Sequence, residues 1–227
     1  MSDSFKIRKG LVSLLMTDAA KMISYREVKE EDYPELAKLI SDTWKYEQLC
    51  GEREAAQHLS RLYLKSCLQN QTFTQVAVSD GKVVGVIMGR SNRAAKKASL
   101  KSALSLLGDA AKLRSSKAGR QISELFREFS ELNKELLAEC RQYFDGELVF
   151  FAVNADFQGL GIGRKLLGSL LDYLNAEGAH LIYVFTDATC NYTFYEKNGF
   201  TRIGEKAKDL RPLIDYSLKM FIYSYRL

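Results

Sequence analysis

A glycine-rich turn between an apolar strand and an amphipathic helix is the segment of this sequence best suited to bind a ligand. The turn reads Gln158-Gly159-Leu160-Gly161-Ile162-Gly163, and two cations, Arg164 and Lys165, follow it. The first N–H groups of a helix have no partner within the helix, and the helix dipole makes that end positive. Glycines let a phosphate approach the main chain because no Cβ obstructs it. The sequence therefore predicts a phosphate or pyrophosphate site.

Two other nucleotide-binding motifs also place glycines between a strand and a helix, and the spacing argues against both. A Rossmann turn has GxGxxG in the first βα unit and an acidic residue about 20 residues further on. This chain has GxGxG late in the sequence, and Asp187 lies 24 residues after Gly163, at the start of a predicted helix. A Walker P-loop needs Gly-Lys followed by Ser or Thr, which does not occur at this turn. A tight turn without a ligand remains the alternative.

Two runs of residues resemble the motifs of one enzyme superfamily. Val153 to Leu167 resembles motif A of the GNAT N-acetyltransferases, which is written Gln/Arg-x-x-Gly-x-Gly/Ala. Asn191 to Phe200 is similar to the family's following motif, which ends in Tyr-Glu-Lys-x-Gly-Phe. The resemblance covers residues 22 to 227 apart from a helical segment at 91 to 145. It implies the GNAT fold and acetyl-CoA as co-substrate.

Carried over position by position, the resemblance implies how this chain would hold acetyl-CoA. The backbone of Phe151, Ala152 and Val153 would pair with the pantetheine arm like an added strand. Asn191 would lie near that arm, although the family often has this asparagine one helical turn earlier, where this chain has Ala188. The motif residues around the pyrophosphate would be Gln158, Gly159, Leu160, Gly161, Ile162, Gly163 and Arg164.

Acetyl transfer to an amine needs a base for the amine proton and a proton donor for the departing thiolate. The resemblance implies that Tyr195 is the donor; the alternative is that it packs beside Phe194 and Phe200. Glu147 opens an apolar strand 11 residues before Gln158, the spacing at which protein acetyltransferases of this superfamily have a general base. Partial burial would raise the pKa of Glu147 toward the useful range. The alternative is an exposed carboxylate at the strand end.

The periodicity of apolar residues predicts an α/β fold with a mixed, twisted sheet flanked by helices. Strands are expected at Ile23 to Val28, Thr74 to Ser79, Lys82 to Gly89, Glu147 to Val153, His180 to Thr186 and Tyr216 to Tyr225. Asp80-Gly81 predicts a hairpin turn. Helices are expected after a cap at Asp32, after Gly51, from Ile162 to a stop at Gly178, and from Asp187 to Asn198. Ser91 to Asp145 predicts an inserted helical hairpin.

Positive charge is concentrated in the predicted insertion. Residues 91 to 120 carry eight Lys or Arg against one acid, a net +7 in a chain whose total is +5. Such a segment can attract an acidic acceptor, help to bind the CoA 3′-phosphate or contact nucleic acid, and a solvated helix face is the commonest outcome. No aromatic residue lies among these cations. Stacking on nucleic acid is therefore not expected.

The four cysteines and two histidines predict neither a disulfide framework nor a metal site. The cysteines lack CxxC spacing, and Cys190 has no histidine partner that would make it a nucleophile. No apolar stretch reaches the ~20 residues that span a bilayer, so no membrane partner is expected. Residues 1 to 21 form an N-terminal extension without a signal-peptide cleavage site, and residues 22 to 227 form the acetyltransferase domain. We expect a reduced, metal-free, cytoplasmic protein.

The leading hypothesis is an acetyl-CoA-dependent N-acetyltransferase. A primary amine of a small molecule or a protein would attack the thioester directly, in a ternary complex. Two other functions stay open from the sequence: a non-catalytic acyl-CoA-binding sensor, and a nucleic-acid-associated protein that uses the basic insertion. No motif identifies the acceptor, and a homodimer is compatible with the sequence.

Overall fold

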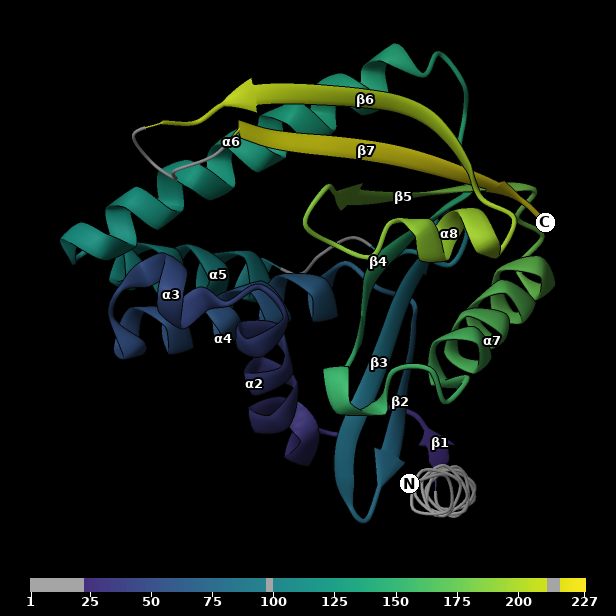
Figure 1. The fold of residues 1–227 in the computed structure, drawn as a ribbon, viewed down its shortest axis with the longest axis horizontal. Coiled ribbons are helices and arrows are strands. Elements are labelled where there is room, and N and C mark those ends of the chain that lie inside the picture. The colour runs from purple at the N-terminus through teal and green to yellow at the C-terminus, as the bar shows by residue number, and fades with distance from the viewer. Residues whose placement is uncertain (1–22, 97–99, 212–216) are drawn as a thin grey trace, which may run out of the picture.

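The computed structural model describes residues 23–96, 100–211 and 217–227, and these form a seven-stranded mixed sheet with helices on both faces (Figure 1). The strand order is β1-β2-β3-β4-β5-β7-β6, and every neighbouring pair is antiparallel except β4 and β5. The strands are β1 Ser24–Arg26, β2 Phe73–Ser79, β3 Lys82–Ser91, β4 Gly146–Val153, β5 Leu181–Asp187, β6 Thr201–Asp209 and β7 Ser217–Arg226. The predicted N-terminal extension lies outside the described residues, as does Tyr216.

The helices divide into two groups that cover opposite faces of the sheet. Their bounds are η1 Glu30–Asp32, α2 Tyr33–Thr43, α3 Tyr46–Cys50, α4 Arg53–Gln69, α5 Leu100–Leu113, α6 Lys117–Glu139, η2 Ala155–Phe157, α7 Ile162–Ala176 and α8 Thr193–Lys197. One hydrophobic core joins α2, α3, α4 and α6 to the sheet, and the other joins α7 and α8 to it. None of the helices in the described ranges is long and apolar enough to cross a membrane.

Two local predictions have different outcomes. The hairpin at Asp80-Gly81 is confirmed: φ is 49° and 76° at these residues, and Ser79 pairs with Lys82. Positive φ at both central positions is what a two-residue hairpin loop requires. Asp32 is the N-cap residue of α2, as predicted, but its side chain makes no hydrogen bond to that helix. Its carboxylate instead accepts two hydrogen bonds from Arg26, at 2.6 and 2.8 Å, and one from the N–H of Lys29, at 2.8 Å. Asp32 thus ties β1 to the start of α2.

The helical insertion between β3 and β4 is confirmed as α5 and α6. Ion pairs attach it on both sides: Asp109 of α5 lies 2.5 Å from Lys65 of α4, and Lys206 of β6 lies 2.6 Å from Glu135 of α6. Figure 1 shows α6 running along β6 and β7, on the face opposite to α8. Through α6, the insertion therefore covers one face of β6 and β7.

Candidate active site

The parallel strands β4 and β5 are paired at only one end. Their register contains Gly146↔Ile182 and Glu147↔Tyr183, and from Leu148 onward β4 pairs with no described strand on that edge. In Figure 1, β4 runs down the view, whereas β5, β7 and β6 cross its top. The other edge of β4 stays paired with β3 as far as Val153. An unpaired strand edge presents N–H and C=O groups to which an extended ligand can add as a further strand.

Asp145 fastens the closed end of this opening. Its carboxylate accepts hydrogen bonds from the N–H groups of His180 and Leu181, at 2.8 and 3.0 Å, and its own N–H donates to the Leu181 carbonyl at 2.7 Å. These backbone donors hold the pKa of Asp145 below its usual value. The two strands are thus locked together just before they part.

The glycine-rich turn lies at the open end, where β4 finishes. Gly159 and Gly161 have φ of 82° and 80°, a left-handed conformation that glycine adopts without a steric cost, and Gly161 caps α7. A Cβ at either glycine would meet no atom within 4 Å. The first hydrogen bond of α7 runs from Lys165 N to Gly161 O, and the N–H groups of residues 159 to 164 donate to no acceptor in the described ranges. These residues fit a pyrophosphate, because their N–H donors are unpaired and there is open space beside Gly159 and Gly161.

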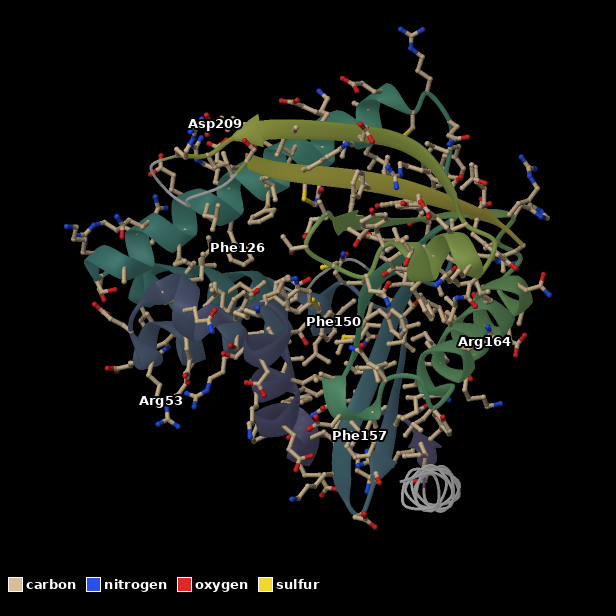
Figure 2. The ribbon with its side chains drawn as sticks, viewed as in Figure 1. Arg53, Phe126, Phe150, Phe157, Arg164 and Asp209 are labelled. Atoms are coloured by element: carbon tan, nitrogen blue, oxygen red, sulfur yellow. The ribbon has the colours of Figure 1, made fainter. Side chains whose placement is uncertain are left out.

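Gly163, the third glycine of the turn, is explained by packing and not by the expected approach of a phosphate. A Cβ on Gly163 would lie 3.2 Å from Cζ of Phe151 and 3.3 Å from Cε2 of Phe194, so this position is small because α7 packs closely against β4 and α8. The rings of Phe151 and Phe194 are 5.2 Å apart. Gln158 folds back, with Nε2 3.2 Å from the Val153 carbonyl. Arg164 is exposed on α7 (Figure 2).

Glu147 stands at the last paired row before the strands part. Its side chain is only 16% exposed, so it is not a free carboxylate at a strand end. Burial raises its pKa, while the charge of Arg90 and a hydrogen bond with Tyr183 act in the opposite direction. Arg90 Nη2 lies 3.6 Å from Glu147 Oε2. A carboxylate whose pKa is raised in this way binds a proton more strongly than an ordinary glutamate, which suits a general base.

An extra residue in β4 decides which way Glu147 faces. Met88 of β3 pairs with Phe150 and Gly89 pairs with Leu148, so Val149 has no partner and forms a bulge. Phe150 belongs to the core under α2, α4 and α6, and so does Tyr183, which contacts Glu147. Leu148 belongs to the core under α7. Glu147 therefore faces the helices of the first group, together with Phe150.

Tyr195 lies on α8, in the other core. Its ring contacts those of Phe200 and Tyr223, with centroids 5.5 and 5.9 Å away. Tyr195 therefore packs in the aromatic core, as the alternative interpretation expected. Its hydroxyl makes no hydrogen bond to any residue that the structure describes. Burial raises the pKa of Tyr195, with further contributions from Cys190 and Asp187 at the end of β5. The hydroxyl therefore stays protonated at neutral pH, and it has no hydrogen-bond partner in the part of the chain that the structure describes.

The helix predicted from Asp187 to Asn198 is shorter than expected. Asp187 is the last residue of β5, and its carboxylate accepts hydrogen bonds from the N–H of Thr189, at 2.7 Å, and from its hydroxyl. Such a turn delays helix formation, so α8 starts at Thr193. Asn191 is exposed in this connection and accepts a hydrogen bond from Thr193 Oγ1 at 2.9 Å. Burial raises the pKa of Cys190 to about 12, which does not favour a reactive thiolate.

The sequence did not reveal a polar network that anchors α8. The fully buried Tyr223 of β7 donates to Glu196 Oε1 at 2.8 Å and accepts from Arg202 Nε at 2.9 Å, and Arg202 also pairs with Glu196 at 2.9 Å. The network places Tyr223 against the Tyr195 ring. Glu196 is part of the Tyr-Glu-Lys motif, but its partners come from strands that no motif marks. In the described ranges, no group of three or more metal-binding side chains occurs.

Comparison of the sequence with known proteins identifies one family. A sequence model of the acetyltransferase (GNAT) family matches residues 33–200. The chain is 42% identical over 59 residues to a mycothiol acetyltransferase from Geodermatophilus obscurus, and 41% identical over 69 residues to an uncharacterized protein from Mycobacterium leprae. The matches take up 25% and 30% of this chain, but only 19% and 18% of those proteins. The chain therefore matches less than a fifth of each curated relative.

Solved structures share the fold over nearly their whole length. An N-acetyltransferase from Staphylococcus aureus Mu50 has a TM-score of 0.52 at 16% identity, with 90% of this chain and 98% of that chain covered. A protein from Pyrococcus horikoshii OT3 has a TM-score of 0.54 at 22% identity, with the same coverage. At these identities the likeness concerns the fold alone. Because the family model spans most of the sequence, the chain belongs to the acetyltransferase (GNAT) family.

Proposed function

We propose that this chain is an acetyl-CoA-dependent N-acetyltransferase that acetylates a primary amine of a small molecule or a protein by direct attack in a ternary complex. One observation carries the proposal: the free edge of β4 begins directly after Glu147, a buried carboxylate, and ends at a turn with free N–H donors. From Glu147 to Val153 the strand extends about 20 Å. A long ligand with an anionic end and a reactive end fits this edge.

The cofactor-binding residues proposed from the sequence belong to this edge and to the turn that follows it, apart from Asn191. The backbone of Phe151, Ala152 and Val153 would bind the pantetheine arm, with Asn191 nearby on the connection before α8. Acetyl-CoA would supply an acyl group activated as a thioester. A shallow surface hollow continues from Gly161 along α7, past Arg164 and Lys165, and the rest of the nucleotide would lie on this side. The pyrophosphate would be held by Gln158, Gly159, Leu160, Gly161, Ile162, Gly163 and Arg164.

The two catalytic residues would handle protons at separate places. Glu147 would take the amine proton, directly or through a water molecule, because burial raises its pKa above that of an ordinary glutamate. Tyr195 would donate its hydroxyl proton, or a hydrogen bond, to the departing sulfur, since its hydroxyl makes no hydrogen bond to any residue that the structure describes. The proposal names only an amine as the acceptor. One family relative is named for mycothiol, and a Brucella melitensis enzyme of the same fold for ribosomal-protein alanine.

Acetyl-CoA is expected to raise the melting temperature of the protein, because a ligand that binds only the native state stabilises it by mass action. Replacing Gly161 with valine should remove most of this increase, since a β-branched residue does not tolerate φ of 80°. Differential scanning fluorimetry with and without acetyl-CoA measures the effect. Gly108→Val is the matched control, because Gly108 lies in α5 with open space around it.

Two results would count against the proposal. If acetyl-CoA does not stabilise the wild-type protein at millimolar concentration, the chain does not bind this co-substrate. If Gly161→Val gains as much as the wild type, the turn does not hold the pyrophosphate, and the ligand binds elsewhere.

A further inference from the structure

Three polar side chains from adjacent strands meet where β4 and β5 part. Arg90 of β3 pairs directly with Glu147 of β4, and Glu147 pairs with Tyr183 of β5. Residues directly opposite each other in a sheet place their side chains on the same face. The three side chains therefore form a row across the sheet, and this row is the last one before the opening.

The row surrounds a carboxylate that has little access to water. The side chains of Glu147 and Arg90 are 16% and 29% exposed, and Tyr183 is 6% exposed. An ionised carboxylate in such a place is costly unless a counter-charge and hydrogen bonds accompany it. Arg90 supplies the charge, with Nη2 3.6 Å from Oε2, and Tyr183 supplies the hydrogen bond.

The guanidinium of Arg90 is itself held in place. Its Nη1 donates to Oδ1 of Asn70, the residue after α4, at 2.7 Å. Its Nε is buried and has no partner among the described residues. Nε and Nη2 lie on the same edge of a guanidinium, which is the edge that binds a carboxylate through two donors. The Arg90 edge that carries Nη2 therefore has a second donor available to Glu147.

The helix α4, which packs against this row, places no charged group beside Glu147. Its Cys67 is close enough for Glu147 to affect its titration, and burial raises the pKa of that thiol to about 12. Cys67 is therefore neutral at physiological pH. In the described ranges, two groups lower the pKa of Glu147: Arg90 by its charge and Tyr183 by a hydrogen bond.

We propose that Arg90 and Tyr183 are positioning residues that hold Glu147 as a carboxylate beside the opening between β4 and β5. The inference rests on the proposed function, in which Glu147 takes the amine proton. Without its two partners, burial would keep the Glu147 side chain protonated and unable to act as a base. With them, the proton acceptor is present before the acceptor amine arrives. Arg90 acts through its charge, so lysine should replace it better than glutamine.

The test measures the titration of Glu147 directly and needs no acceptor amine. The protein is labelled with ¹³C at glutamate Cδ, and the Glu147 signal is identified by its loss in Glu147→Gln. In Arg90→Gln the Glu147 midpoint should move to higher pH by about one pH unit or more, the effect of removing an opposite charge at this distance. Arg90→Lys should stay near the wild-type midpoint, and Tyr183→Phe should shift it in the same direction as Arg90→Gln.

Arg93→Gln serves as the matched control. Arg93 lies three residues further along, and its guanidinium donates to the Glu177 carbonyl, so the Glu147 titration should not change. The inference is overturned if Glu147 titrates at the wild-type midpoint in both Arg90→Gln and Tyr183→Phe. If Arg90→Gln does not fold, Tyr183→Phe decides the question alone. These results are independent of CoA release, whose absence in the wild type would instead refute the proposed function.

Discussion

Replacing Tyr195 with phenylalanine is expected to lower kcat by about 10 to 10⁴-fold, the range for losing a general acid. The substitution removes one hydroxyl that has no hydrogen-bond partner in the described part of the chain. It keeps the ring that packs against Phe200 and Tyr223. Affinity for acetyl-CoA should therefore stay nearly unchanged, and the loss should appear in kcat. Steady-state kinetics at saturating acetyl-CoA, with any amine that supports turnover, measure it.

Tyr225→Phe is the matched control for this experiment. Tyr225 belongs to the same aromatic core, with its ring 4.8 Å from that of Phe200, but it lies on β7 near the end of the chain. Its loss of a hydroxyl should leave kcat unchanged. If Tyr195→Phe also keeps the wild-type kcat where chemistry limits the rate, Tyr195 only packs in the core, and the sulfur takes its proton from elsewhere.

Replacing Glu147 with glutamine is expected to lower kcat/KM by about 10² to 10⁴-fold at low pH, with partial recovery at high pH. Because burial raises the pKa of Glu147, the base form is lost at a higher pH than for an ordinary glutamate. Wild-type activity should therefore fall as the pH drops through that pKa. Glutamine keeps the shape but cannot take a proton, and at high pH the free amine is already abundant. A pH profile of kcat/KM for both proteins checks this.

The acidic limb of the wild-type profile can also reflect the amine itself, so the comparison between proteins carries the conclusion. Glu131→Gln is the control, since Glu131 is exposed on α6 and pairs only with Lys134 in the described structure. A Glu147→Gln profile with the height and acidic limb of the wild type would assign proton removal to water or to another residue.

The sequence predicts well where a signal is local. The hairpin at Asp80-Gly81, the start of α7 after Gly161 and its end at Gly178 depend on residues that are neighbours in the chain, and the structure has all three. The GNAT motifs are equally local. They predict the family because a strand, turn and helix that bind a phosphate need particular residues at fixed spacing.

The sequence predicts poorly where contacts join distant segments. Thr201–Asp209 was not predicted as a strand, because β6 is an edge strand with charged residues in place of an apolar pattern. The row of Arg90, Glu147 and Tyr183 could not be found either. It depends on the β3–β4 register across the inserted α5 and α6, and on a bulge at Val149. Two charged residues beside apolar runs were the available signs: Arg90 near the end of β3 and Glu147 near the start of β4.

Release of CoA from acetyl-CoA in the presence of amines tests the central claim most directly. A panel of amino acids, polyamines, aminoglycosides and peptides with free N-termini covers small-molecule and protein acceptors. At least one class is expected to accelerate CoA release well above the rate without amine, and Gly161→Val should abolish this acceleration. If acetyl-CoA stabilises the protein but no class of amine accelerates CoA release, the chain binds acyl-CoA without transferring the acyl group, and the assignment as an N-acetyltransferase is contradicted.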